Sequence, residues 1–329
     1  MSKKKVLVCA MQLHKRRGVW LQKLEDAGFE VEFNTLGRKL TEAELIDHLP
    51  GAYATIAGSE PYNDSSFTAA KELRIIARWG VGYDQVDIDA ATRNGVAVAM
   101  AFGANHEAVA DAAFALMSAQ ANDILPYHKL VAGGGWGGRY HVGLHQKTVG
   151  IVGLGRIGQA FARRCQGFET RILGYDPLIP ADAVRDLGVQ LVPLEQLLAD
   201  SDFVSLHAPR APETEGLINR DSLALMKPSA YLINTSRANV VDETALIDAL
   251  TSGGIAGAGL DVFAAEPPGD SPLLKLDNVL LMPHSAGASA DAVEGVSERC
   301  VESIIAISRG ENPGDDLVLN PETLEGARA

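Results

Sequence analysis

Basic residues, cysteines and long apolar runs are all scarce in this sequence of 329 residues. There are 29 Lys and Arg residues against 42 Asp and Glu residues, and the net charge of −13 argues against nucleic acid or an anionic membrane as the main partner. No segment approaches the ~20 consecutive apolar residues of a membrane-spanning helix. The early apolar run, residues 6–10, is too short for a signal peptide. We therefore expect a cytoplasmic protein.

The few cysteines and clustered histidines give no sign of a disulfide or a metal site. Cys9, Cys165 and Cys300 are odd in number, far apart and outside any Cys-x-x-Cys motif, so we interpret them as reduced thiols that pack in the core. His141 and His145 are four residues apart, but glycines surround them and no acid joins them. We expect no metal there.

Strand patterns alternate with helical patterns through the first 102 residues. A capping box, Thr41-x-x-Glu44, begins one of the helices. The expected strands are 5–10, 29–36, 53–57, 74–78 and 96–100, and the expected helices are 19–27 and 41–49. Such alternation predicts a parallel sheet with helices on both faces, which binds ligands at the carboxyl ends of its strands.

A second α/β pattern begins at residue 147, and the length and the 47% hydrophobic content suit a globular chain of two domains. Its expected strands are 149–152, 171–175, 203–207, 230–234, 255–260 and 279–282, and its expected helix is 242–250. Polar residues follow these strands repeatedly, as at the rim of a binding crevice. The last helix, 290–308, is expected to return and complete the first unit.

The segment between the two patterns is rich in alanine and then in glycine. Residues 106–130 predict one long helix that Pro126 kinks or ends, and this helix suits either a core or a subunit interface. Glycines dominate residues 133–138, which we expect to form a mobile connection anchored by Trp136.

One glycine motif predicts a dinucleotide site. Gly153, Gly155 and Gly158 form Gly-x-Gly-x-x-Gly between an apolar strand and a helical pattern. In such a site the first glycine allows a tight turn, the second lets a pyrophosphate approach the backbone, and the third lets the helix pack on its strand. The helix N-terminus offers free N–H groups to the phosphates.

The acid that ends the next strand indicates which dinucleotide binds. Asp176 lies at the distance along the chain that suits an acceptor for the ribose hydroxyls. No arginine follows it directly, and its charge would repel a 2′-phosphate, so NAD is favoured over NADP.

Three residues at or just after strand ends suit the oxidation of a 2-hydroxy acid by a nicotinamide cofactor. Arg237 has the planar fork that holds a carboxylate, and His284 carries an imidazole, a group whose unperturbed pKa is close to working pH and suits proton exchange. Glu266 would favour the charged imidazolium if it lay beside His284. Each residue could instead have no catalytic role. Arg237 could be a surface arginine, His284 the first residue of a helix, and Glu266 a solvent-exposed acid.

Two loops at strand ends of the first unit are candidates for substrate selection. These are residues 58–62 and residues 78–84, and Gly80 and Gly82 bracket Val81 in the second. Successive N–H groups there could form a nest for a carboxylate, or the loop could be an ordinary turn. Arg78 either meets a substrate phosphate or pairs with a nearby acid.

Taken together, these motifs resemble the D-isomer-specific 2-hydroxyacid dehydrogenases over nearly the whole chain, and the Gly-Val-Gly-Tyr-Asp loop resembles the phosphoglycerate dehydrogenase-like branch. The matching segments are 78–84, 103–105, 153–158 with Asp176, 234–243, 259–263 with Glu266 and Pro267, and 283–287. The resemblance implies an NAD-binding Rossmann domain, 103–287, inserted into a flavodoxin-like substrate domain, 1–102 and 288–329. It also implies a homodimer built on the cofactor domains.

The resemblance further implies a role for each matching residue. Arg237, Glu266 and His284 are implied as the catalytic group, with Glu266 paired to the proton donor His284. Substrate-binding roles are implied for Arg78, Val81 and Gly82, together with Arg237 and His284, with the Val81 and Gly82 amides and Arg237 holding the carboxylate. The implied cofactor contacts are Gly153, Gly155, Arg156, Ile157, Gly158, Asp176, Ala208, Thr235, Ser236, Arg237, Asp261 and His284.

The expected activity is hydride transfer between NAD and C2 of a small 2-hydroxy or 2-oxo acid, of the 3-phosphoglycerate or glycerate/hydroxypyruvate type. Alternatives are a phosphite-type oxyanion dehydrogenase and a non-catalytic NAD-binding corepressor. Ala238 and Asn239 depart from the glycines that often follow the arginine in the family. Because the chain ends near residue 329, we expect no regulatory domain like that of longer phosphoglycerate dehydrogenases.

Overall fold

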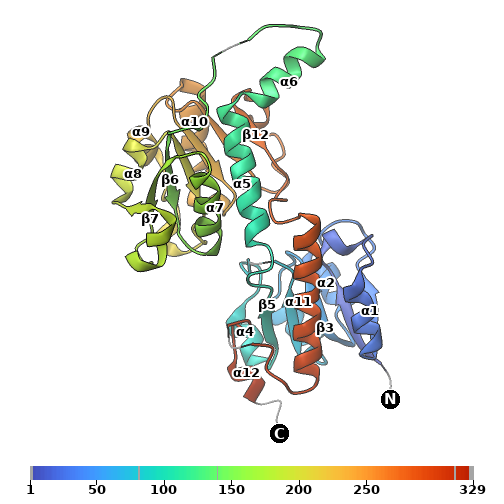
Figure 1. Cartoon of the computed structure of the whole chain (residues 1–329). Coiled ribbons are helices and arrows are strands. Elements are labelled where there is room, and N and C mark those ends of the chain that lie inside the picture. Colours follow the sequence, from blue (N-terminus) through green and yellow to red (C-terminus); the bar gives the residue numbers. More distant parts are fainter. Residues whose placement is uncertain (1–2, 81, 139, 315, 326–329) are drawn as a thin grey trace. The chain divides into compact units, whose positions relative to one another are not determined.

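The chain folds into two compact units, and the second is inserted into the first (Figure 1). The computed structural model describes residues 3–80, 82–138, 140–314 and 316–325. The first unit consists of residues 1–105 and 288–329, and the second unit consists of residues 106–287. Each is built on a fully parallel sheet, which confirms the predicted fold class.

The first unit has a five-stranded sheet in the order β2-β1-β3-β4-β5, the flavodoxin-like arrangement. Its strands are β1 (Lys4–Val8), β2 (Phe29–Phe33), β3 (Ala52–Ala57), β4 (Ile75–Arg78) and β5 (Ala97–Met100). Its helices are α1 (Val19–Asp26), α2 (Glu42–His48), α3 (Asp64–Ala69), α4 (Ile88–Arg93), α11 (Ala290–Ser308) and α12 (Glu322–Glu325), with a 3₁₀ turn at Met11–Leu13.

Two apolar layers cover the faces of this sheet. Trp20 and Leu24 of α1 pack on one face with Val296 and Ile304 of the returning helix α11, whose predicted boundaries are confirmed. Leu45 of α2 and several residues of α3 and α4 pack on the other face. Helices α3 and α4 were not predicted, because each is a six-residue segment without a clear apolar period.

The second unit has a seven-stranded sheet in the order β12-β11-β10-β9-β6-β7-β8, and the order reverses at β6 as in a Rossmann sheet. Its strands are β6 (Thr148–Val152), β7 (Arg171–Tyr175), β8 (Val189–Leu191), β9 (Phe203–Leu206), β10 (Tyr231–Asn234), β11 (Gly257–Leu260) and β12 (Val279–Leu281). Its helices are α5 (His106–Ala121), α6 (Ile124–Ala132), α7 (Arg156–Gln166), α8 (Leu194–Asp200), α9 (Arg220–Leu225) and α10 (Glu243–Ser252). Four 3₁₀ turns lie at Ala181–Leu187, Pro212–Thr214, Ala238–Val240 and Pro272–Lys275.

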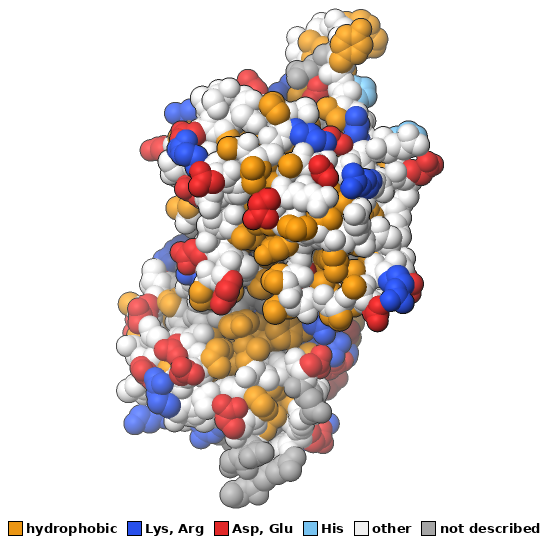
Figure 2. Space-filling model, turned by 90° about the vertical axis from the view of Figure 1, so that its left-hand side faces the viewer, with side chains coloured by type: hydrophobic (Ala, Val, Ile, Leu, Met, Phe, Trp, Pro, Cys, Tyr) orange, Lys and Arg blue, Asp and Glu red, His pale blue; other side chains and the backbone are white. Residues whose placement is uncertain are grey.

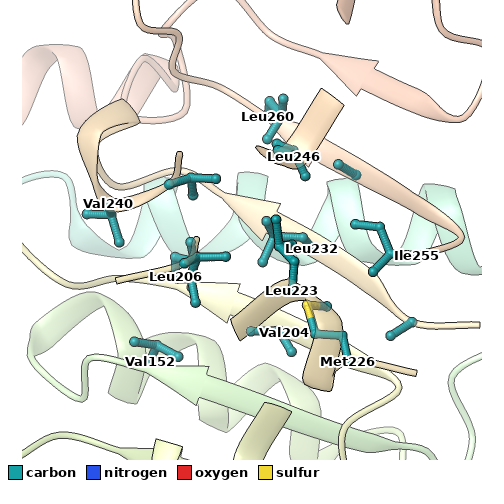
Figure 3. Close-up of a cluster of buried hydrophobic side chains, with 14 of the residues drawn as sticks. Val152, Val204, Leu206, Leu223, Met226, Leu232, Val240, Leu246, Ile255 and Leu260 are labelled. Carbon is teal, nitrogen blue, oxygen red and sulfur yellow. The ribbon is translucent and has the colours of Figure 1, made fainter. Parts of the chain in front are cut away.

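Leucine and valine side chains hold the central strands of this second sheet against α9 and α10 (Figure 3). Val204 and Leu206 of β9 and Leu232 of β10 meet Leu223 of α9 and Leu246 of α10 in this layer. Burial of each such side chain contributes about 1.5–3 kcal/mol to the free energy of unfolding. The layer therefore fixes the strands whose carboxyl ends carry the predicted site residues.

The predicted single helix over residues 106–130 is wrong in one respect. It breaks into α5 and α6 before Pro126, where Asp123 has a left-handed φ of 50° and the Asn122 side chain donates to the carbonyl of Ser118 at 2.9 Å. Pro126 then lies in the first turn of α6, where the N–H that proline lacks would have no helical partner. Asn122 and Asp123, rather than the proline, end the first helix.

The predicted anchor at Trp136 is also wrong for the single chain, because 91% of its surface is exposed. The three cysteines are buried and free, as predicted. Burial raises the pKa of Cys165 and of Cys300 to about 12, so both are neutral thiols. Among the described residues, no helix is long and apolar enough to cross a membrane, and no group of His, Cys, Asp and Glu side chains is arranged to hold a metal ion.

Candidate active site

The glycine loop after β6 packs so tightly that two of its positions exclude any side chain. A Cβ on Gly158 would lie 2.0 Å from the carbonyl oxygen of Gly153, so α7 could not rest against its strand. Gly153 has φ +90° and lies against the backbone of Ala208, where a Cβ would approach the amide nitrogen at 2.7 Å. A Cβ on Gly155 would meet no atom within 4 Å. The loop is thus closed toward the protein and open at the N-terminus of α7.

Asp176 joins the end of β7 to this glycine loop. Its Oδ2 accepts the N–H of Leu154 at 2.8 Å, and its Oδ1 accepts the N–H of Leu178 at 2.9 Å. Each oxygen keeps a lone pair for a further donor. The carboxylate therefore holds the loop in shape and can still accept a ribose hydroxyl.

The loop after β10 is organised by Asn234. The Asn234 side chain accepts from the N–H and the hydroxyl of Ser236 and donates to the carbonyl of Arg237 at 3.0 Å. The guanidinium of Arg237 in turn donates to the carbonyl of Ser236 at 2.8 Å. The Thr235 hydroxyl is buried beside them without a hydrogen-bond partner in the described structure, and such a group is stabilised by a ligand that hydrogen-bonds to it.

Glu266 and His284 lie within hydrogen-bond distance in the second unit. Glu266 Oε2 is 2.7 Å from His284 Nδ1, and Glu266 Oε1 accepts the N–H of Phe263 at 3.2 Å. Because an ionised carboxylate only accepts, Nδ1 carries the hydrogen and Nε2 points to other partners. Half of the His284 side chain, 52%, is exposed, so Nε2 can reach a bound molecule.

The charges around Glu266 keep its carboxylate ionised. Burial alone would raise its pKa, but the hydrogen bond and charge of His284 oppose burial, together with the N–H of Phe263 and the charge of Arg237. The net effect lowers the pKa of Glu266 below its usual value. Arg237, Glu266 and His284 therefore belong to one electrostatic group at neighbouring strand ends.

Asp261, at the end of β11, fixes the segment that carries His284. Its two carboxylate oxygens accept the N–H groups of Ser285 at 2.7 Å and Ala286 at 2.9 Å, and its carbonyl accepts the N–H of His284 at 2.9 Å. Burial raises the pKa of Asp261, although the two N–H groups act in the opposite direction. Held in this way, His284 adopts a left-handed φ of 52°, which is unusual for a residue other than glycine and typical of functional sites.

The second histidine at a strand end, His207, has a different environment. Its Nε2 lies 3.0 Å from the Ser205 hydroxyl, its ring packs on Phe161, and its Nδ1 is buried without a hydrogen-bond partner in the described structure. Burial lowers the pKa of His207 to about 3, so the ring is neutral at physiological pH. His207 contributes shape behind Gly153, whereas His284 is placed to exchange a proton.

The candidate substrate loops lie in the first unit, at the carboxyl ends of β3 and β4. Arg78 ends β4, and its Nη1 donates to the carbonyl of Ala57 at 3.2 Å and to that of Trp79. Gly82 is half-buried, while Val81 lies outside the described residues. The predicted nest at these two amides remains a prediction.

Several residues that shape the site were not predicted from the sequence. Asn234 organises the Arg237 loop, and Glu243 of α10 accepts the N–H of Ala264 at 2.9 Å, which fastens the segment before Glu266. Both side chains form hydrogen bonds to backbone groups of residues further along the chain. The only sequence signal for Asn234 is a polar residue at a buried strand end.

These features fit a bound dinucleotide. The open backbone at Gly155, the N-terminus of α7, which has no side-chain cap, and the unpartnered Thr235 hydroxyl are groups that such a ligand would satisfy. Arg156 and Ile157 begin α7 beside them, and Ala208 closes the loop from behind.

Comparisons with known proteins agree with this geometry. A family model described as D-isomer specific 2-hydroxyacid dehydrogenase, NAD binding domain, matches residues 114–286. The chain is 47% identical over 262 residues to a glyoxylate reductase of Korarchaeum cryptofilum, covering 78% of this chain and 79% of that protein. It is 40% identical over 287 residues to a D-3-phosphoglycerate dehydrogenase of Archaeoglobus fulgidus, covering 86% of this chain and 54% of that protein.

The chain is also similar to solved structures of 2-hydroxyacid dehydrogenases. The D-lactate dehydrogenase from Aquifex aeolicus, complexed with NAD and lactic acid, superimposes with a TM-score of 0.84 at 25% identity. The superposition covers 96% of this chain and 99% of that chain.

Replacement of Asp176 by alanine is expected to raise the dissociation constant of NADH about tenfold or more, since hydrogen bonds to a charged group contribute about 1.5–3 kcal/mol. NADPH should be affected much less, because the variant also loses the charge that repels a 2′-phosphate. Fluorescence titration with both cofactors measures the ratio, with Glu195→Ala, an exposed acid of the same unit, as the control. An unchanged NADH-to-NADPH ratio would remove Asp176 from the ribose site.

Proposed function

The chain belongs to the D-isomer specific 2-hydroxyacid dehydrogenase family, and we propose that within this family it reduces a small 2-oxo acid of the glyoxylate or hydroxypyruvate type with NADH. The observation that carries the proposal is the 2.7 Å contact between Glu266 and His284, in which the charge of Arg237 also acts on the Glu266 carboxylate. The identity of 47% to a protein named glyoxylate reductase supports this substrate class.

The cofactor is NAD, as the NAD-binding domain match indicates. We assign the pyrophosphate to the backbone of Gly155, Arg156 and Ile157, and the ribose to Asp176. Ala208, Thr235, Ser236 and Asp261 are assigned to the rest of the cofactor track. When bound, the nicotinamide supplies the hydride; the surrounding residues hold and orient the reactants.

Arg237 is proposed to bind the substrate carboxylate and to polarise the C2 carbonyl. Its guanidinium donates to the carbonyl of Ser236 at 2.8 Å, which limits its movement, and the planar fork of an arginine suits a carboxylate. Holding the substrate in one orientation lowers the entropy lost on reaching the transition state.

His284 is proposed to donate the proton that the C2 oxygen receives on reduction. Glu266 fixes the Nδ1–H orientation and stabilises the charged ring, so Nε2–H points to the substrate oxygen. The backbone of His284 is held by Asp261 and its ring by Glu266, so its direction depends on two separate contacts.

A panel of 2-oxo acids with NADH tests the proposed function. We expect turnover of glyoxylate and hydroxypyruvate, measured as the loss of NADH absorbance, and no turnover of 2-oxo acids with bulky side chains. Tight NADH binding without turnover of any acid would instead support a non-catalytic NAD-binding protein. Oxidation of phosphite in the reverse assay would support an oxyanion dehydrogenase.

The Arg237→Ala variant should lose most turnover, about 100-fold or more in kcat/KM, because a charge-assisted contact to the reacting group is lost. NADH binding should stay within about twofold, since the side chain is assigned to the substrate; a titration of NADH fluorescence measures this. Arg210→Ala, an exposed arginine after β9, is the matched control. Equal losses of NADH affinity and turnover would contradict the assignment.

We also propose a homodimer formed through the second unit. Helix α6 projects from the seven-stranded sheet, and hydrophobic side chains are visible at its tip (Figures 1 and 2). Large apolar side chains on α6 and the following segment are exposed, namely Ile124, Leu130, Val131, Trp136 and Tyr140. Exposed apolar surface of this kind is typical of a protein–protein interface.

The Val131→Glu variant is expected to shift the protein from dimer to monomer, because it places a charge in the proposed interface. Light scattering after size-exclusion chromatography measures the mass. Leu178→Glu serves as control, since Leu178 is 91% exposed on another part of the unit. A monomeric wild-type protein would rule the dimer out.

A further inference from the structure

A buried carboxylate at the carboxyl edge of the first sheet has no role in the proposed reaction. Glu60 lies in the loop after β3 and is only 1% exposed, although glutamate is among the residues most rarely buried. Its Oε2 has no hydrogen-bond partner in the described structure. Burial raises the pKa of Glu60, and the backbone N–H groups of Glu60 and Gly58 and the charge of Arg78 oppose this effect and favour the ionised carboxylate.

The carboxylate is enclosed by a tight backbone turn. Both Glu60 oxygens lie against Gly58, where an added Cβ would approach Oε1 at 2.8 Å, Oε2 at 3.0 Å and the Cα of Ala10 at 3.3 Å. The neighbouring side chains cannot neutralise it. Tyr62 is buried and donates to Cys9 Sγ at 3.8 Å, and burial raises the pKa of both groups, so both are neutral.

Arg78 is the cation that acts most strongly on this carboxylate. Burial raises the pKa of Glu60, and the charge of Arg78 opposes burial more strongly than that of the exposed Lys39 does. The Arg78 guanidinium is held close by, because its Nη1 donates to the carbonyl of Ala57, the residue before Gly58. Glu60 and Arg78 therefore share one small region, where their charges offset each other.

The charge of Glu60 weakens the electrostatic attraction between Arg78 and an anionic group of a substrate. A lone arginine at the carboxyl edge would attract the dianionic phosphate of a substrate such as 3-phosphohydroxypyruvate. With Glu60 beside it in a region of low dielectric, the attraction of the cation is offset by a negative charge of the same size. An uncharged substituent at C3 of the substrate does not need the charge of Arg78, so Glu60 does not weaken its binding.

We propose that Glu60 is a specificity-determining residue, which makes the Arg78 edge electrically balanced and so selects 2-oxo acids with an uncharged tail over phosphorylated ones. This inference rests on the proposed function and narrows its substrate class. Glu60 acts through the charge of Arg78, without a part in hydride or proton transfer.

The test compares kcat/KM for hydroxypyruvate and for 3-phosphohydroxypyruvate, with NADH, in the wild type and in Glu60→Gln. The wild type should prefer hydroxypyruvate. The variant should reduce this preference about tenfold or more, chiefly through a lower KM for the phosphorylated acid, and high salt should shrink the effect. Glu72→Gln, an exposed acid of the same unit, should leave the ratio unchanged.

A second variant covers the case in which Glu60→Gln does not fold. Arg78→Gln leaves Glu60 without its main compensating charge, so the preference for hydroxypyruvate should rise rather than fall. The inference would be overturned if a variant that folds and retains turnover kept its ratio of kcat/KM for hydroxypyruvate to kcat/KM for 3-phosphohydroxypyruvate within twofold of the wild type. It would also be overturned if the wild type preferred the phosphorylated acid. A wild type that turns over no 2-oxo acid at all would overturn the proposed function itself.

Discussion

The hydrogen bonds of Asp261 are the interaction on which the proposed proton-donor site depends. The carboxylate binds two consecutive N–H groups, those of Ser285 and Ala286, and thereby turns the chain directly after β12. His284 precedes them and has a left-handed φ of 52°, a backbone conformation that costs roughly 1 kcal/mol or more outside glycine. Without this turn, the ring of His284 would have no fixed direction toward Glu266.

At other strand ends of the second unit, polar side chains likewise hold a nearby loop through hydrogen bonds to its backbone. Asp176 after β7 binds the N–H of Leu154, and Asn234 in β10 binds the Ser236 and Arg237 backbone. In each case a side chain at a buried edge satisfies backbone groups that a tight loop would otherwise leave unpaired. The leucine and valine layer beneath keeps the strands in register, so the loops are positioned by a rigid sheet.

Sequence patterns predicted the first sheet, the fold class, the last helix and six strands of the second sheet, but missed the short edge strand β8, because strand alternation and helical periods are local signals. They failed where a short polar segment decided the structure. Helices α3 and α4 begin at Asn63 and Asp87, whose side chains accept from backbone N–H groups, and α5 ends at Asn122 before the proline. Some candidate site residues could be named in advance because they follow strands, and others only through the family resemblance, but the left-handed backbone of His284 depends on Asp261, 23 residues earlier.

The two units differ in how their sequences encode a site. In the second unit, the proposed catalytic side chains lie after strand ends, and strand ends can be recognised from the sequence. In the first unit, the relevant property is the environment of Glu60. Its loop contains glycine and proline, as the loop of an exposed acid would, and only the packed structure places its carboxylate against Gly58 and within reach of the charge of Arg78. Burial turns an ordinary loop acid into a charge that must be balanced. The proposed effect of Glu60 on substrate choice therefore acts through its environment, the charge of Arg78, rather than through a position at a strand end.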